Sequence, residues 1–326
     1  MSDAPRVLLI NPTITGKRHA RFPLAVLSLA TALEGRYAAT ILDGNIDREF
    51  VSSAERLVGG GGIAAVGVTV MGGPQLLSAI AVSKAIRARA PGVPIIWGGA
   101  FPTGCPEATV NATYVDYAVR SQGEETLVEL LDALTTSQPD TLPKIRGVSW
   151  GRDGCVVHNP ERAFSPASLN RMLPYDTLEN PRQYLTRTYL GARTAGYQAA
   201  LGCRFRCTFC GVATMYRGKT ALPPAARLEQ DRRLLAELGG TLLEVRASDT
   251  ASGLIQAART AGACQLVIGS RRRPHWPRLL KGSTVADQVL SMAGALPVQV
   301  VNVGRPDKAS DEWHRQRRDA RQRRRG

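Results

Sequence analysis

Three cysteines, Cys203, Cys207 and Cys210, stand close together in the sequence. Their C-x3-C-x2-C spacing suits a cubane iron–sulfur cluster, because three thiolates can hold three of its irons and leave the fourth open to a substrate. A structural zinc ion would need a fourth Cys or His, and the next histidine along the chain is His275. The spacing therefore favours a [4Fe-4S] cluster, with zinc as the alternative.

The other cysteines are scattered, and we expect Cys105, Cys155 and Cys264 to be small buried apolar residues. Six cysteines without a secretory pattern at the N-terminus indicate metal binding more than disulfides. No apolar stretch is long enough to cross a membrane. We therefore expect a cytoplasmic protein without a membrane partner.

The chain carries a formal net charge of +15 over 326 residues. Part of this excess lies in the tail 305–326, where nine Lys and Arg residues stand against four Asp and Glu residues. Such a run is typical of a solvated, disordered tail. We do not expect a nucleic-acid partner.

The first 140 residues alternate apolar runs with helical patterns, which is typical of a parallel sheet with crossover helices. The expected strands are Arg6–Asn11, Tyr37–Leu42, Ala64–Val70, Val93–Trp97 and Val115–Val119. The expected helices are Leu24–Leu33, Gln75–Ala88 and Glu124–Leu134. The pattern predicts an α/β, doubly wound, Rossmann-like domain over residues 1–140.

A sheet of this kind binds ligands beyond the carboxyl ends of its strands. The loops expected there supply the candidate binding residues Met71, Gly72, Gly73, Gly98, Gly99, Gly123 and Glu124. Their glycines would let a bulky ligand approach the backbone, or would simply permit tight turns. The G-x-G-x-x-G pattern does not follow the first strand, which argues against NAD.

A connector is expected over 141–190, with a hairpin formed by Gly147–Trp150 and Cys155–Asn159. A further strand, Gly196–Leu201, leads into the cysteines within a segment 191–237. An α/β pattern resumes over 238–304. Its expected strands are Leu242–Arg246, Gln265–Gly269 and Val298–Val303, and its expected helices are Ala251–Ala261 and Ser283–Met292.

The cysteine loop, with Phe209 directly before its last cysteine, resembles that of the radical SAM superfamily. The preceding domain resembles the cobalamin-binding domain of one branch of that superfamily. This second resemblance is carried by the stretches VLLINP, VGVTVMGGPQ, PIIWGGAFPTGCPE and VDYAVRSQGEETLVELL. Together the two resemblances cover residues 5–235, and segment 191–237 corresponds to the opening of a radical SAM (β/α) partial barrel.

The resemblance implies that Cys203, Cys207 and Cys210 ligate the cluster and that the open iron binds S-adenosylmethionine. One electron, from a donor such as a flavodoxin or ferredoxin, would then generate a radical that abstracts hydrogen from a small-molecule substrate. Cobalamin would lie across the sheet as a methyl carrier, so the implied reaction is methyl transfer or rearrangement at an unactivated carbon.

The resemblance also assigns positions. Phe209 would cover the cluster, and the loops at Met71–Pro74, Gly98–Phe101 and Gly123–Glu124 would face the corrin. The sequence has no Asp-x-His-x-x-Gly pattern, so cobalamin would bind without a histidine on cobalt.

The segment 238–304 resembles part of the universal stress protein fold, as found in potassium-sensor kinases. Gly269, Arg272, Gly282 and Ser283 follow its G-x2-G-x9-G-[ST] pattern, with arginine at the second glycine. The start of a helix at Gly282–Ser283 could hold a phosphate of ATP or another nucleotide. Alternatively, Ser283 is a helix cap in a domain that binds nothing.

The stretch between the cysteines and this segment is shorter than a radical SAM barrel normally needs. Two functions therefore stay open. One is a cobalamin-dependent radical SAM enzyme. The other is a truncated or fused, non-catalytic protein that binds cobalamin or, in a stress-protein-like module, a nucleotide.

Overall fold

The structure, a computed structural model, describes residues 4–136, 139–188, 191–194, 196, 198, 200–204, 210–237, 247–260, 262–263, 265–270 and 285–302. The chain forms two compact units, Met1–Asp231 and Arg232–Gly326.

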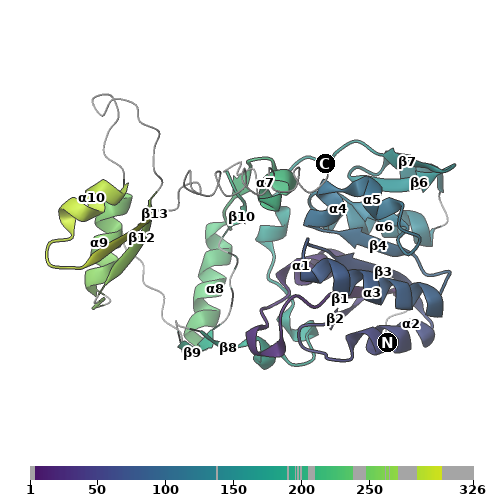
Figure 1. The fold of residues 1–326 in the computed structure, drawn as a ribbon, viewed down its shortest axis with the longest axis horizontal. Helices are drawn as coiled ribbons and strands as arrows, with labels where there is room; N and C mark the ends of the chain where they lie inside the picture. The colour runs from purple at the N-terminus through teal and green to yellow at the C-terminus, as the bar shows by residue number, and fades with distance from the viewer. Residues whose placement is uncertain are drawn as a thin grey trace, which may run out of the picture. The chain divides into compact units, whose positions relative to one another are not determined.

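The first unit is built on a seven-stranded sheet with the order β2-β1-β3-β4-β5-β6-β7 (Figure 1). Its strands are β1 Arg6–Asn11, β2 Ala38–Asp43, β3 Ile63–Thr69, β4 Ile95–Gly98, β5 Tyr117–Val119, β6 Val148–Arg152 and β7 Cys155–His158. The first five are parallel, and β6 and β7 are antiparallel additions beside β5. The order reverses between β1 and β3, which is where such sheets bind ligands.

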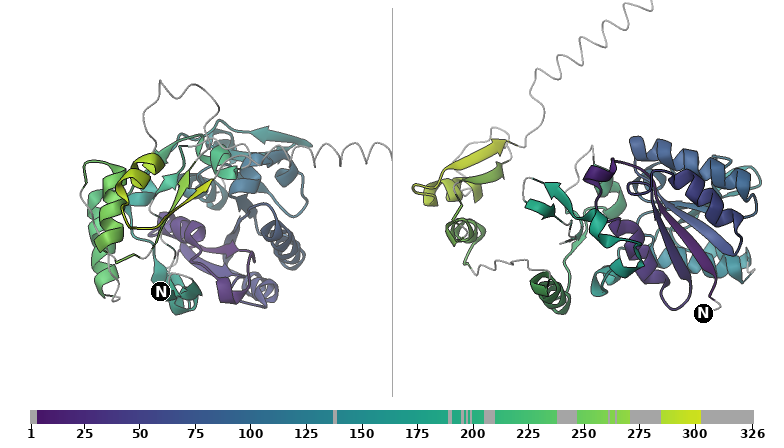
Figure 2. Two further views of the ribbon diagram at one scale, coloured as in Figure 1. Left: turned by 60° about the vertical axis from the view of Figure 1, so that its left-hand side comes forward. Right: turned by 90° about the horizontal axis from the view of Figure 1, so that it is seen from below.

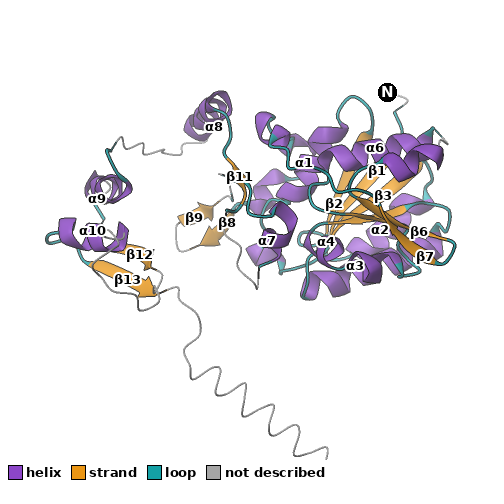
Figure 3. Cartoon of the chain, turned by 90° about the horizontal axis from the view of Figure 1, so that it is seen from above, coloured by secondary structure: helices purple, strands orange, loops and turns teal. Residues whose placement is uncertain are grey.

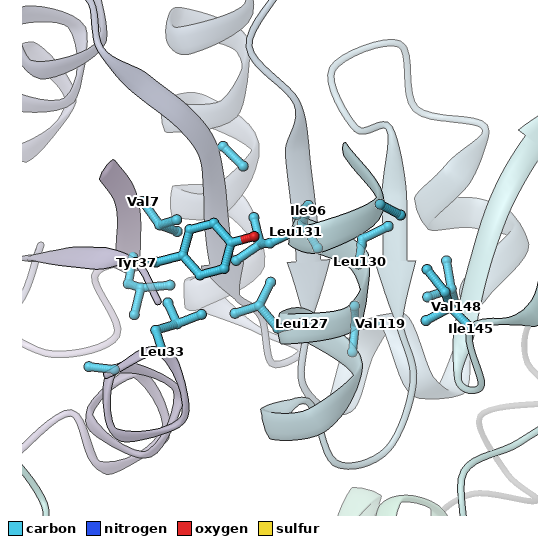
Figure 4. Packing of buried hydrophobic residues seen from close by; sticks show 14 of the residues in the cluster. Val7, Leu33, Tyr37, Ile96, Val119, Leu127, Leu130, Leu131, Ile145 and Val148 are labelled. Atoms are coloured by element: carbon cyan, nitrogen blue, oxygen red, sulfur yellow. The ribbon is translucent and has the colours of Figure 1, made fainter. Parts of the chain in front are cut away.

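Helices cover both faces of this sheet, as Figures 2 and 3 show. One face packs against α1 Leu24–Leu33 and α6 Glu124–Thr135, and the other against α2 Phe50–Gly59 and α3 Pro74–Arg89. The apolar run Val7–Ile10 of β1 is fully buried because its side chains enter both layers. Figure 4 shows the first layer, where Val7 and Ile96 meet Leu127 and Leu130.

The expected α/β fold with a mostly parallel sheet is confirmed. Strand β1 and helix α1 have the expected bounds. Helix α2 was not expected from the sequence, and neither were the short helices α4 Ala100–Gly104 and α5 Pro106–Val110. The expected hairpin exists as β6 and β7, but it extends the main sheet instead of standing apart in a connector, because β6 pairs with β5.

The chain after the hairpin returns to the beginning of the unit. It contains the 3-10 turns η3 Ala167–Asn170, η4 Tyr175–Thr177 and η5 Pro181–Tyr184. Leu178 and Tyr184 pack against Leu27 of α1, and Ile41 of β2 joins the same cluster. The Tyr184 ring stacks on Phe22 with centroids 5.1 Å apart. Two further turns, η1 Lys17–His19 and η2 Pro139–Lys144, complete the 3-10 elements of the described chain.

The segment around the cysteines forms small elements. Strands β8 Thr186–Thr188 and β9 Gly191–Thr194 form one antiparallel pair, and β10 Leu201–Gly202 and β11 Thr220–Ala221 form another. Helix α7 spans Gly211–Tyr216 and α8 spans Ala225–Glu237. The expected strand Gly196–Leu201 is wrong in extent, since only Leu201 of its described residues is in a strand.

The second unit contains α9 Thr250–Thr260, β12 Leu266–Ser270, α10 Val285–Met292 and β13 Val298–Asn302. The two strands are parallel, and Ala251 and Ile255 of α9 pack with Val289 of α10 in a small core. These elements lie within two residues of the expected ones. The expected strand Leu242–Arg246 lies outside the described residues, and the stress-protein resemblance stays a prediction.

Within the described chain, no helix is both long and apolar enough to cross a membrane.

Candidate functional site

A cavity of about 180 Å³ lies at the carboxyl ends of β3, β4 and β5. Its walls come from three parts of the first unit: the strand ends with their following loops, the facing sides of α1 and α6, and the two flanks of the cysteine loop. It is lined by Leu24, Ala25, Ser28, Leu29, Gly67, Val68, Thr69, Ile96, Gly98, Gly99, Val119, Ser121, Gln122, Gly123, Glu124, Leu127, Gln198, Leu201, Met215 and Tyr216.

Four of the residues expected to bind a ligand line this cavity: Gly98, Gly99, Gly123 and Glu124. Gly99 has φ of 104°, and an added Cβ would lie 2.8 Å from the carbonyl oxygen of Val70. A glycine is required here by the close approach of the turn to the end of β3. This requirement holds whether or not a ligand is bound.

The other three, Met71, Gly72 and Gly73, do not line the cavity. They form the exposed turn between β3 and α3, where Met71 is 45% exposed. The backbone N–H of Met71 donates to Gln75 Oε1 at 2.8 Å, which fixes the turn. An added Cβ at Gly72 or Gly73 would meet open space.

A buried polar network ties together the loops that follow β1, β2 and β3. Asp43 Oδ1 accepts hydrogen bonds from Asn11 Nδ2 at 3.0 Å and from Asn45 Nδ2 at 2.7 Å. Gln75 Nε2 donates to Asn11 Oδ1 at 3.1 Å. Burial raises the pKa of the Asp43 carboxyl despite these donors. The network holds the loops of the switch point in one arrangement.

Seven of the residues that line the cavity have polar side chains: Ser28, Thr69, Ser121, Gln122, Glu124, Gln198 and Tyr216. Ser28 Oγ donates to Glu124 Oε1 at 2.8 Å, joining α1 to the start of α6. Burial, with the charge of Glu124, raises the pKa of the Tyr216 hydroxyl, so this phenol stays protonated at neutral pH. The remaining walls are mainly aliphatic. An apolar ring with a few polar substituents fits such a lining.

The flanks of the cysteine loop are held at their base by the β10–β11 pair, in which Gly202 faces Thr220. Gly202 has φ of 79°, and an added Cβ would overlap the Lys219 carbonyl oxygen and lie 3.1 Å from Cγ of Tyr216. Tyr216 therefore packs directly against the residue that precedes Cys203. Leu201, on the same strand, is buried in the cavity wall.

Cys203 and Cys210 are partly buried free thiols. Cys210 is the N-cap residue of α7, and α7 packs on α4, with the Cβ position of Gly211 3.3 Å from Cβ of Ala100. Cys207 and Phe209 lie outside the described residues. Among the residues that are described, no group of three His, Cys, Asp or Glu side chains could hold a metal ion. The three-cysteine cluster site therefore stays a prediction. Cysteine thiolates are the usual ligands of iron–sulfur clusters.

The scattered cysteines and the residues of the expected nucleotide site lie as follows in the structure. Cys105 and Cys155 are exposed, so their expected burial is wrong. Cys105 lies between α4 and α5, and Cys155 follows the tight turn of the β6–β7 hairpin. Gly269 lies in β12 opposite Val301, whereas Cys264, Arg272, Gly282 and Ser283 lie outside the described residues. The nucleotide site stays a prediction.

Three further cavity residues, Ser28, Gln122 and Tyr216, were not expected from the sequence. Gln122 lies between the carboxyl end of β5 and Gly123, so its position could have suggested it. Ser28 faces the cavity from the middle of α1, and Tyr216 ends a helix far along the chain. Neither residue has a local pattern that indicates a site.

The protein is an α/β protein whose cavity lies at the carboxyl ends of a parallel sheet. Residues 19–131 match the B12 binding domain family. That stretch contains α1, β2 to β5, most of α6 and many of the cavity residues, so the chain carries a B12-binding domain.

Two curated relatives extend this similarity. The uncharacterized methyltransferase PH0819 of Pyrococcus horikoshii is 26% identical over 196 residues, which are 60% of this chain and 41% of that protein. The anaerobic magnesium-protoporphyrin IX monomethyl ester cyclase of Cereibacter sphaeroides is 27% identical over 130 residues, which are 40% of this chain and 21% of that one. The chain thus matches less than half the length of either.

Two solved structures have a similar fold. The radical S-adenosylmethionine methyltransferase TsrM from Kitasatospora setae, with cobalamin and a [4Fe-4S] cluster bound, matches 91% of this chain and 58% of its own, with a TM-score of 0.56 and 18% identity. The second is the cobalamin-dependent S-adenosylmethionine radical enzyme OxsB, with aqua-cobalamin and S-adenosylmethionine bound. The match covers 91% of this chain and 44% of that one, with a TM-score of 0.61 and 16% identity.

Proposed function

We propose that this chain is a cobalamin-dependent radical SAM protein, which binds cobalamin, a [4Fe-4S] cluster and S-adenosylmethionine. The reaction that we propose is a radical methyl transfer or a rearrangement at an unactivated carbon of the substrate. One observation carries the proposal. The cavity of the B12-binding domain is walled by Leu201, Met215 and Tyr216, which bracket the three cysteines. Residues on both sides of the three cysteines therefore line the cavity, which supports the proposal that both cofactors bind in the first unit.

The chain's residues suit a corrinoid in their shape and chemistry. The aliphatic part of the cavity lining suits the apolar parts of a corrinoid, and Ser28, Glu124 and Tyr216 offer polar atoms at the cavity wall. The exposed turn at Met71–Gly73 adjoins the same edge of the sheet and leaves room for a large group. None of the chain's four histidines lies in the Asp-x-His-x-x-Gly pattern, so we propose binding without a histidine on cobalt.

Cys203, Cys207 and Cys210 would hold the cluster as thiolates, and Phe209 would shield it from water. When bound, S-adenosylmethionine at the open iron supplies a 5′-deoxyadenosyl radical on one-electron reduction, and cobalamin supplies a methyl carrier. The partners we propose are a small-molecule substrate and an electron donor such as a flavodoxin or ferredoxin.

Cobalamin binding is tested first, by titrating the purified full chain with hydroxocobalamin and following retention on gel filtration. We expect about one cobalamin per chain. Absence of retained cobalamin would contradict this half of the proposal.

The cluster is tested by anaerobic reconstitution with iron and sulfide, followed by EPR of the reduced protein with and without S-adenosylmethionine. We expect a [4Fe-4S] signal that shifts on adding S-adenosylmethionine. The Cys203→Ala, Cys207→Ala, Cys210→Ala triple variant serves as the control without a cluster. A cluster whose signal does not shift would favour a non-catalytic cofactor-binding protein.

A further inference from the structure

The segment that carries the cysteines shares a wall with the cavity, and this wall is continuous with both ends of the cysteine loop. On one side Leu201 lines the cavity and is separated from Cys203 only by Gly202. On the other side Cys210 caps α7, whose last residues, Met215 and Tyr216, line the cavity again.

Tyr216 is the residue in which these contacts converge. Its ring lies against Gly202, and it meets Phe164 edge-on with ring centroids 6.2 Å apart. It ends the helix that Cys210 begins, and Arg217 after it adopts the left-handed conformation with φ of 51°. The ring therefore contacts Gly202, which precedes Cys203. Through the short helix α7, Tyr216 is also linked along the chain to Cys210.

We infer that Tyr216 is a positioning residue that couples occupation of the cavity to the retention of a cluster by the cysteines. This inference rests on the proposed function, since it needs both cofactors. A ligand in the cavity that contacts the Tyr216 ring restricts the ring, and with it the two flanks of the loop. Coupling of this kind is reciprocal, so a bound cluster also tightens the binding of the cavity ligand.

The test measures how fast the reconstituted full chain loses iron to an excess of a ferrous chelator, with and without saturating hydroxocobalamin. In the wild type we expect hydroxocobalamin to slow the loss by about fivefold or more. This is the lower end of typical equilibrium coupling between two sites, taken here to act on the dissociation of the cluster. In Tyr216→Ala we expect the two rates to agree within about twofold. The ratio of rates is the readout, because a variant that merely loosened the loop would change both rates alike.

Tyr216→Phe keeps the ring and loses only the hydroxyl, and we expect it to keep the wild-type ratio. Leu222→Ala is the matched surface control, since Leu222 is 71% exposed just beyond β11, and it should also keep the ratio. Circular dichroism establishes that each variant is folded before its rates are compared.

The failures are distinguishable. If the wild type retains no cobalamin or forms no cysteine-dependent cluster, the proposed function fails and the coupling fails with it. If the wild type holds both groups but loses iron at the same rate with and without hydroxocobalamin, the coupling alone is wrong. A Tyr216→Ala variant with the wild-type ratio, or a Tyr216→Phe variant without it, would overturn the role assigned to the ring.

Discussion

The hydroxyl of Tyr184 donates a 2.9 Å hydrogen bond to Asp43 Oδ2, joining residues that are 141 positions apart in the chain. Tyr184 lies in η5, whereas Asp43 is the last residue of β2. Both side chains are buried, and burial raises the pKa of each. This contact fixes the returning chain to the carboxyl end of β2.

Removing the hydroxyl should weaken that closure. We expect Tyr184→Phe to lower the free energy of unfolding by about 1.5–3 kcal/mol, because it removes a buried hydrogen bond to a carboxylate. Urea denaturation measures the change. Tyr114→Phe is the control, because the Tyr114 hydroxyl makes no hydrogen bond to any of the residues that the structure describes. A loss as large in that variant would contradict the assignment to the Asp43 contact.

The raised pKa of Asp43 predicts a pH dependence with a defined sign. A carboxyl whose folded pKa exceeds its unfolded value contributes stability that is full below the ordinary pKa of 3.8 and is lost as pH rises through the folded pKa. Asp43→Asn cannot titrate. We therefore expect its stability deficit relative to the wild type to be larger at about pH 4 than at about pH 7.5. Urea denaturation at the two values checks this, and a deficit that grows with pH would contradict it.

Filling the cavity should reduce ligand binding without unfolding the protein. Ala25 lines the cavity from α1, and Ala25→Trp places an indole in the space available to a ligand. We expect hydroxocobalamin binding to weaken at least tenfold, or about 1.4 kcal/mol. Ala81→Trp is the matched control, since Ala81 is exposed on α3 and does not line the cavity. Equal weakening in both variants would place the cobalamin elsewhere.

Gly202 should not tolerate a side chain. We expect Gly202→Ala to cost about 1–3 kcal/mol, because the left-handed backbone is strained for alanine and the new Cβ overlaps the Lys219 carbonyl oxygen. The iron content after reconstitution should fall with it. Gly16→Ala is the control, at φ of −73° with open space around the Cβ position. If both variants retain equal iron and stability, the packing at Gly202 does not support the cysteine loop.

The secondary-structure elements that have a clear local sequence pattern could be predicted from the sequence. Four consecutive apolar residues in β1 and the regular apolar positions of α1 predicted both elements with their observed bounds. Helix α2 was missed because its ten residues include Ser52, Ser53 and a terminal Gly59, which weaken the helical pattern. Short helices of this kind are stabilised by packing, here of Phe50 and Ala54 on the sheet.

The site was predictable only in part, for a related reason. Gly98 ends β4 and Gly123 follows β5, so the parallel fold places both at the carboxyl edge of the sheet. The contributions of Leu201 and Tyr216 to the cavity depend on where a segment more than sixty residues later returns, and no local pattern records that. The pairing of β6 with β5 was not predicted either, because a hairpin pattern in the sequence does not indicate which strand the hairpin pairs with.

The distance along the chain between Asp43 and Tyr184 has a consequence during synthesis on the ribosome. Leu27 and Ile41 emerge early, yet Leu178 and Tyr184, which pack against them, are added much later. At typical elongation rates, 141 residues take about 7–28 s to synthesise. For that time the nascent chain contains Leu27 and Ile41 without the two residues that cover them in the folded unit.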